Sequence, residues 1–256
     1  MKFLAFGVVV GVEAQDPSFF PLLERRLPSF PAAPRAVAPR LAYRVADAGA
    51  GRVVVVRGQR TLATASDLER ASDCLIADLQ SSLGRLAAGW TFVHAGVVAI
   101  DGRALILPAR SWGGKSTLVA ALLRAGASYS SDEFAVLDRD GHVHPYARPL
   151  ARRTADRFLP LAHLGASIMT GCAAVGAVVF TEFRATAAQP LRRLSPGVAI
   201  LRLLEQCLGA RQRPAETLRA LHALASVTPA FTGMRGEADE FARHLIDCAR
   251  KGWRMV

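Results

Sequence analysis

The sequence predicts a mixed α/β protein, and three observations lead to that prediction. Short apolar runs of strand length alternate with longer stretches that are apolar at helical spacing. A glycine-containing loop joins one of these strands to a helix within residues 105–123. Turn sequences such as Asp101-Gly102 separate neighbouring apolar runs, as they do in β-hairpins.

Length and composition limit the number of domains and the class of partner. With 256 residues, of which 51% are hydrophobic, the chain can bury one large core or two smaller ones. We predict a small N-terminal α+β region over residues 1–88 and a larger domain over residues 89–256. The net charge of +11 would suit a nucleic-acid binder, but 29 of the 32 basic residues are arginines scattered through every segment. Nucleic-acid binding is therefore kept only as a low-weight alternative.

The N-terminal apolar run over residues 3–12 has two interpretations. It follows Lys2 and precedes a small-residue stretch ending at Ala14, which resembles a secretory signal peptide. Its valine and phenylalanine content favours an opening β-strand. No run of about 18 apolar residues occurs elsewhere, and the four cysteines lack zinc spacing, so we expect a cytoplasmic protein without a membrane span and with free thiols.

The first 88 residues show the pattern of a small sheet with helices. A helix-like stretch over residues 16–27 precedes a proline-rich surface connection over residues 28–39, and strands follow at 41–45 and 52–58. Ser66, with Glu69 three residues later, predicts the N-cap of a long amphipathic helix that ends near residue 89.

The remaining residues alternate between strands and helices. We predict a hairpin of strands 92–100 and 104–107, a helix from Lys115 to about Arg124, and strands at 134–137 and 177–183. Residues 196–251 are predicted to form two or three helices. Their expected core residues are spaced as on one helix face: Leu201, Leu204, Leu208, Leu218, Leu221 and Leu224.

The loop between the strand 104–107 and the following helix carries a candidate phosphate-binding site. Residues 109–116 match the pattern of glycine, four residues, Gly-Lys and Ser/Thr at every position except the first, where Ala109 stands. Such a loop directs backbone N–H groups and a helix N-terminus at an anion. The candidate nucleotide-binding residues are Ser111, Trp112, Gly113, Gly114, Lys115, Ser116 and Thr117.

Two acidic residues follow this helix. Phosphoryl transfer needs Mg²⁺, and Ser116 with a carboxylate can hold it. In a parallel βαβ unit, Asp132 and Glu133 would lie beside the loop at the carboxyl ends of the strands. Adjacent strand residues point to opposite faces, so only one acid can face the phosphate unless the strand ends there, and Asp132 is the choice.

These motifs resemble a known family. The strand beginning His94-Ala95-Gly96, the Asp101-Gly102 turn, the loop to Ser116 and the acidic pair are similar to the C-terminal catalytic domain of HPr serine kinase/phosphorylase. They are more similar to its short HPr-kinase-like relatives, some of which accompany lasso-peptide and other ribosomal-peptide clusters. The spacings from His94 through Glu133 agree without gaps.

The resemblance implies a fold and a set of roles. Residues 89–256 would form a P-loop core of the HPr-kinase/PEP-carboxykinase type with C-terminal helices. Lys115 would bind the phosphates of ATP, and Ser116 and Glu133 would hold Mg²⁺. Asp132 would act as the base toward an acceptor serine, and His94 would lie close to that base and tune it.

The chain also departs from the family. Trp112 replaces a small residue, and its indole can either stack on the nucleotide or pack locally. The family's N-terminal regulatory domain has no recognisable counterpart, which weakens the case for HPr as the substrate. We therefore predict an ATP-dependent kinase that phosphorylates a serine on a peptide or small protein, with an oligomer left open. The alternative is a nucleotide-binding or NTP-hydrolysing accessory protein without phosphotransfer.

Overall fold

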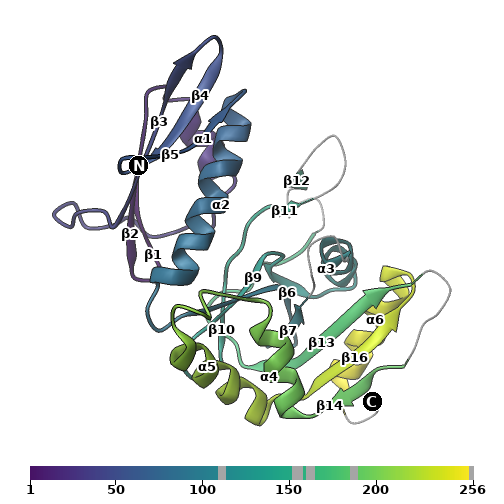
Figure 1. Cartoon of the computed structure of the whole chain (residues 1–256). Coiled ribbons are helices and arrows are strands. Elements are labelled where there is room, and N and C mark those ends of the chain that lie inside the picture. Colours follow the sequence, from purple (N-terminus) through teal and green to yellow (C-terminus); the bar gives the residue numbers. More distant parts are fainter. Residues whose placement is uncertain (109–113, 152–157, 160–164, 185–189, 254–256) are drawn as a thin grey trace. The chain divides into compact units, whose positions relative to one another are not determined.

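The computed structural model divides the chain into two compact units, residues 1–88 and residues 89–256 (Figure 1). It describes residues 1–108, 114–151, 158–159, 165–184 and 190–253. Both units combine strands with helices, so the chain is a mixed α/β protein.

The first unit is built on a five-stranded sheet. The sheet order is β1-β2-β3-β4-β5, and every neighbouring pair is antiparallel except β2 and β3, which are parallel. The strands are β1 (Lys2–Ala5), β2 (Val8–Ala14), β3 (Leu41–Gly49), β4 (Arg52–Arg57) and β5 (Arg60–Ala65).

The N-terminal apolar run forms two strands where the sequence predicted one. Phe6 and Gly7 both have positive φ, at 48° and 80°, and turn β1 back onto β2. Two consecutive residues of positive φ are typical of the tight turns that suit a hairpin. The side chains of Val8, Val10 and Val12 are buried in the core of the unit.

Two helices accompany this sheet, α1 (Phe19–Glu24) and α2 (Leu68–Leu86). The predicted N-cap of α2 was wrong by one residue. Asp67, not Ser66, accepts the hydrogen bond from the N–H of Arg70, at 2.7 Å. A carboxylate is a stronger hydrogen-bond acceptor than a hydroxyl, and its negative charge is stabilised by the positive end of the helix dipole.

The second unit contains a mixed sheet whose main order is β10-β9-β6-β7-β13-β16-β14, with β8 and β15 also paired to β6. The predicted hairpin is confirmed as β6 and β7, and Asp101 and Gly102 turn between them with φ of 48° and 78°. The strands are β6 (Thr91–Ile100), β7 (Arg103–Pro108), β8 (Ser128–Ser131), β9 (Phe134–Leu137), β10 (Val143–His144), β13 (Val175–Phe183), β14 (Arg192–Leu194), β15 (Cys207–Leu208) and β16 (Ala230–Arg235). A separate pair is formed by β11 (Leu150–Ala151) and β12 (Phe158–Leu159).

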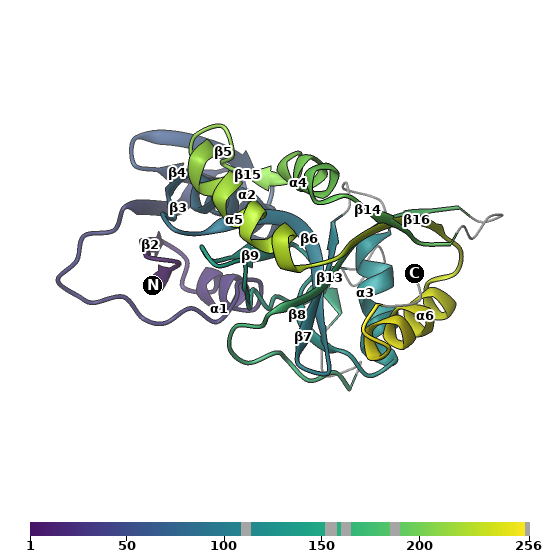
Figure 2. The same cartoon turned by 90° about the horizontal axis from the view of Figure 1, so that it is seen from below.

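Helices cover both faces of this sheet, as Figure 2 shows. The helices α3 (Lys115–Arg124) and α6 (Ala238–Arg250) pack on one face, and α4 (Pro196–Leu204) and α5 (Pro214–Val227) pack on the other. Side chains alternate along β6 accordingly. Val98 faces α3 and α6, whereas Val97 belongs to the core beneath α4 and α5.

The C-terminal region forms three helices, α4, α5 and α6, in agreement with the two or three expected there. A strand that was not expected, β16, separates α5 from α6 and lies between β13, to which it is parallel, and the edge strand β14. Leu221 and Leu224 are buried as predicted, but Leu201 and Leu218 are 64% and 45% exposed. Because α4 and α5 contact the sheet on one side only, part of each apolar helix remains in solvent.

Two further observations concern the surface and the thiols. No helix in the described part of the chain is long and apolar enough to cross a membrane. The four cysteines are free, as predicted, and burial raises the pKa of Cys207 to about 12.

Candidate functional site

The candidate site lies where β7 and β8 end. Both strands pair with β6 in antiparallel fashion, so they run in the same direction with β6 between them. Pro108 at the end of β7 lies opposite Ala95, and Ser131 at the end of β8 lies opposite Val97. The strands that flank α3 are therefore not neighbours, yet their carboxyl ends meet at the same edge of the sheet.

The loop after β7 leads into α3 through Gly114. Gly114 is the N-cap residue in the left-handed conformation, with φ of 72°, and α3 begins at Lys115. The first N–H groups of a helix have no partner within it and form an anion-binding end. Of the predicted nucleotide-binding residues, Ser111, Trp112 and Gly113 lie outside the described residues, as does Ala109. Thr117 lies exposed on the first turn of α3.

Lys115 and His94 are in direct contact. The lysine Nζ lies 2.7 Å from the histidine Nε2. An ammonium can only donate, so a charged Lys115 donates this hydrogen bond and the imidazole accepts it through Nε2. Burial lowers the pKa of Lys115, while the nearby carboxylates of Glu133 and Asp132 act in the opposite direction. A neighbouring anion would therefore stabilise the charged form of this half-buried lysine.

Ser116 and Asp132 form the second contact of the site. The Ser116 hydroxyl donates to Asp132 Oδ2 at 3.2 Å, and the Tyr129 hydroxyl donates to Oδ1 at 3.0 Å. Asp132 is only 3% exposed. Burial, together with the charge of Asp132, raises the pKa of Tyr129 well above its ordinary value, so the phenol remains a donor.

The acidic pair lies at a break between two strands. β8 ends at Ser131 and β9 begins at Phe134, and both pair with β6. The Ser131 hydroxyl accepts from the N–H groups of Glu133 and Phe134 at 3.0 and 2.9 Å. Because the pair is outside a regular strand, the alternation of faces does not apply to it, and both carboxylates act on the charge of Lys115.

Close packing sets the distance between β6 and α3. A Cβ on Gly96 would lie 2.7 Å from Val119 Cγ2 and 3.2 Å from Lys115 Cγ. Glycine at this position therefore lets the first turns of α3 approach the strand that carries His94. That approach is what brings Lys115 and His94 into contact.

Sequence reasoning missed two residues of this site. Tyr129 precedes Asp132 by three residues, and its spacing from the acid is the signal that would have found it. Arg235 ends β16, a strand that was not predicted, and it donates to the Gly114 carbonyl at 3.0 Å. No local pattern links Arg235 to the loop, because 121 residues separate it from Gly114.

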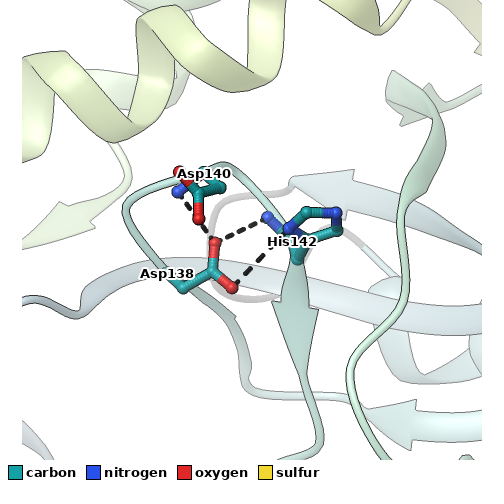
Figure 3. A group of neighbouring side chains, drawn as sticks. All are labelled: Asp138, Asp140 and His142. Atoms are coloured by element: carbon teal, nitrogen blue, oxygen red, sulfur yellow. Dashed lines mark hydrogen bonds and ion pairs between the residues drawn. The ribbon is translucent and has the colours of Figure 1, made fainter.

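A second acidic cluster belongs to a turn. Asp138, Asp140 and His142 lie close enough to share a cation, as Figure 3 shows. However, the Asp138 carboxylate accepts from the N–H groups of Asp140 and His142 and from His144 Nε2, each at 2.9 Å. Partial burial raises the pKa of Asp138, but these hydrogen bonds outweigh it and hold the pKa below its ordinary value. We assign the cluster to the turn between β9 and β10.

Comparison with known proteins gives a distant structural likeness. No family model matches the sequence, and no curated protein sequence matches it. Among solved structures, the chain is similar to the Hpr(Ser) kinase/phosphatase from Coxiella burnetii, at 13% identity over 63% of this chain and 94% of that chain, with a TM-score of 0.33. Two structures that differ this much do not allow residue roles to be transferred, so the function is derived from the site itself.

Proposed function

We propose that this chain binds Mg²⁺-ATP at the start of α3 and transfers the γ-phosphate to a serine hydroxyl of a peptide or small protein. One observation carries the proposal. Lys115, His94, Ser116 and Asp132 meet at the N-terminus of α3 through two direct contacts, between Lys115 and His94 and between Ser116 and Asp132. The proposal includes a P-loop core of the HPr-kinase/PEP-carboxykinase type for residues 89–256.

The residues present fit a nucleotide and its metal. Lys115 and the first N–H groups of α3, which have no acceptor within the helix, supply positive charge for the phosphates. The hydroxyl of Ser116 and the two carboxylates of the acidic pair are oxygen donors, which Mg²⁺ prefers. When bound, Mg²⁺ would neutralise charge on the transferring phosphoryl group. The chain's own contribution is to hold these donors and the lysine at one edge of the sheet.

The transfer step requires a base and an in-line acceptor. The serine oxygen forms a bond to the γ-phosphorus while the bond to the β,γ-bridging oxygen breaks, and ADP leaves. The hydroxyl proton passes to a carboxylate of the chain. In the division of roles implied by the family resemblance, Asp132 takes the proton and Glu133 holds Mg²⁺.

The hydrogen bonds support a second division of roles. Asp132 is 3% exposed and already accepts from Ser116, as expected of a carboxylate that shares Mg²⁺ with the loop hydroxyl. Glu133 is more accessible and would then serve as the base. Glu133→Gln should abolish transfer but preserve Mg²⁺-dependent ATP binding under this division. Under the first division, Asp132→Asn has that effect.

The test of the proposed function is calorimetric titration with Mg²⁺-ATP. Wild type should bind, Lys115→Ala should lose binding, and the exposed Lys251→Ala serves as the matched lysine control. Failure of wild type to bind millimolar Mg²⁺-ATP would end the proposal. If binding occurs, γ-labelled ATP and a library of serine peptides then measure transfer.

A nucleotide hydrolase without an acceptor is the second candidate. The observation that favours it is that Asp132 is buried and that both of its carboxylate oxygens accept hydrogen bonds. A water molecule can approach this carboxylate more easily than a serine side chain of another protein can. Steady phosphate release with no labelled peptide would identify this function. Binding of DNA or RNA that survives Lys115→Ala and weakens steeply with salt would instead indicate nucleic-acid binding.

A further inference from the structure

Arg235 brings a buried cation to the start of α3. It is the last residue of β16, which runs parallel to β13, and β13 runs parallel to β7. These three strands therefore end at the same edge of the sheet, and Arg235 at the end of β16 contacts Gly114 at the start of α3 (Figure 1).

The guanidinium of Arg235 is held on several sides. The residue is 3% exposed, its Nη2 donates to the Gly114 carbonyl at 3.0 Å, and its Nη1 donates to the Gly236 carbonyl at 3.3 Å. The guanidinium lies 5.4 Å from the centre of the Phe183 ring. In the described chain, its buried Nε has no hydrogen-bond partner.

Among the described residues, the charge of Arg235 has no ion-pair partner. None of the ion pairs found among the described residues involves it. Burial lowers its pKa and the charge of Glu237 acts in the opposite direction, but an arginine keeps its proton at any physiological pH. A buried arginine without an ion pair contributes little to the stability of the fold, because the desolvation of its charge is not compensated, and this indicates another role.

The hydrogen bond to Gly114 fixes the direction of one peptide group. The Gly114 carbonyl accepts both from Arg235 and from the N–H of Leu118, at 3.0 and 3.1 Å. A trans peptide is planar, so the N–H of Lys115 points opposite to that carbonyl. This N–H is in the first turn of α3, where a helix offers it no acceptor.

The same contact explains why residue 114 is glycine. Gly114 has φ of 72°, which costs other residues roughly 1 kcal/mol or more. In addition, a Cβ there would lie 2.5 Å from Arg235 Nη2. The backbone conformation favours glycine, and a Cβ would also displace the guanidinium from its place beside the Gly114 carbonyl.

We infer that Arg235 is a positioning residue for the nucleotide site. It holds the Gly114–Lys115 peptide so that the N–H of Lys115 and the N-terminus of α3 face the phosphates. The inference rests on the proposed nucleotide binding, and it adds a residue from the far end of the chain to that site.

The test compares Arg235 variants with a matched arginine. Arg202 also lies over an aromatic ring, 5.5 Å from the centre of Phe180, and donates to Thr232, but it is exposed on α4. Mg²⁺-ATP dissociation constants are measured by calorimetry for wild type, Arg235→Met, Arg235→Lys and Arg202→Met, with thermal unfolding of each. Arg235→Met should weaken binding about tenfold to a hundredfold, the factor that one hydrogen bond to a charged group is worth. Arg235→Lys should recover part of the loss, and Arg202→Met should bind as wild type.

A spectroscopic measurement reports on the peptide itself. The chain has three lysines, Lys2, Lys115 and Lys251, so ¹⁵N-lysine labelling gives three backbone amide signals. Without nucleotide, Arg235→Met should shift the Lys115 amide signal and leave the other two in place. Arg202→Met should shift none of them.

The outcomes separate this inference from the proposed function. No binding by wild type overturns the proposed function and the inference together. Wild-type binding with unchanged affinity and an unmoved Lys115 signal in Arg235→Met overturns the inference alone. Loss of binding in Arg235→Met and Arg235→Lys that is matched by unfolding of both would assign Arg235 to the fold, and would also overturn it.

Discussion

Replacing Gly96 by alanine tests whether close approach of α3 to β6 builds the site. The new Cβ would lie 2.7 Å from Val119 Cγ2, about 0.7 Å below the 3.4 Å at which ordinary van der Waals contact begins. Val119 is fully buried in the core beneath α3, so it has little room to move. Overpacking of this kind costs about 1–3 kcal/mol, against roughly 0.5–1 kcal/mol gained by removing a glycine from a strand.

We therefore expect Gly96→Ala to lower the free energy of unfolding by about 1–2 kcal/mol. Urea denaturation measures this loss. Because the clash is with the helix that carries Lys115, affinity for Mg²⁺-ATP should fall as well, and calorimetry of the folded variant measures that effect.

The control variant removes the methyl group that the new Cβ meets. Val119→Ala alone should cost about 1.6 kcal/mol for two lost methyl groups. In Gly96→Ala with Val119→Ala, the total cost should be smaller than the sum of the single costs by about 1–2 kcal/mol. Additive costs, or wild-type stability in Gly96→Ala, would refute the packing argument.

Three further predictions concern charged residues. Lys115→Met should abolish Mg²⁺-ATP binding but change stability at pH 7 by less than about 1 kcal/mol, because burial already disfavours the ammonium. Since burial lowers the pKa of Lys115 on folding, the stability of wild type relative to the variant should rise as pH rises toward the ordinary lysine value of 10.5. An opposite trend in urea denaturation would contradict this. Asp138→Ala should lower the free energy of unfolding by about 1–3 kcal/mol at pH 7, because it removes a hydrogen-bonded acceptor. Because the pKa of Asp138 is lowered in the fold, this difference in stability from wild type should shrink as pH falls toward 3. A difference that stays constant with pH would argue against this role of the carboxylate. Arg26→Met should destabilise residues 1–88 by about 1–3 kcal/mol, because the buried Arg26 side chain donates hydrogen bonds to Ser72 and Asp73. Amide hydrogen exchange in that unit should become faster, and an unchanged exchange rate would show that these hydrogen bonds do not stabilise it.

Local sequence was sufficient for several parts of the second unit. The Asp101-Gly102 turn and the helix from Lys115 to Arg124 lie where they were predicted. Each depends on interactions between residues close in sequence, such as a turn of positive φ or the capping of a helix by neighbouring residues. The exact bounds of the short strands and the N-cap at Asp67 were harder to predict, because several adjacent residues satisfy the same local pattern.

The pairing of strands that are far apart along the chain could not be predicted from the sequence. β16 is only six residues long and is interrupted by Gly233, so its local pattern is too short to predict a strand, and its pairing with β13 and β14 defines it. The break between β8 and β9 has the same origin, since β6 pairs with both of them. Exposure of Leu201 likewise depends on which face of α4 the sheet covers.

The sequence by itself determined that this chain is a mixed α/β protein in which a glycine-lysine-serine loop precedes a helix and an acidic pair follows it. These features arise from short-range preferences of the backbone. Only the tertiary structure decided that His94 contacts Lys115, that Asp132 accepts from Ser116 and Tyr129, and that Arg235 holds the Gly114 carbonyl. Such contacts join residues on different strands and helices, and their distances are set by the packing of α3 against the sheet, which no local pattern specifies.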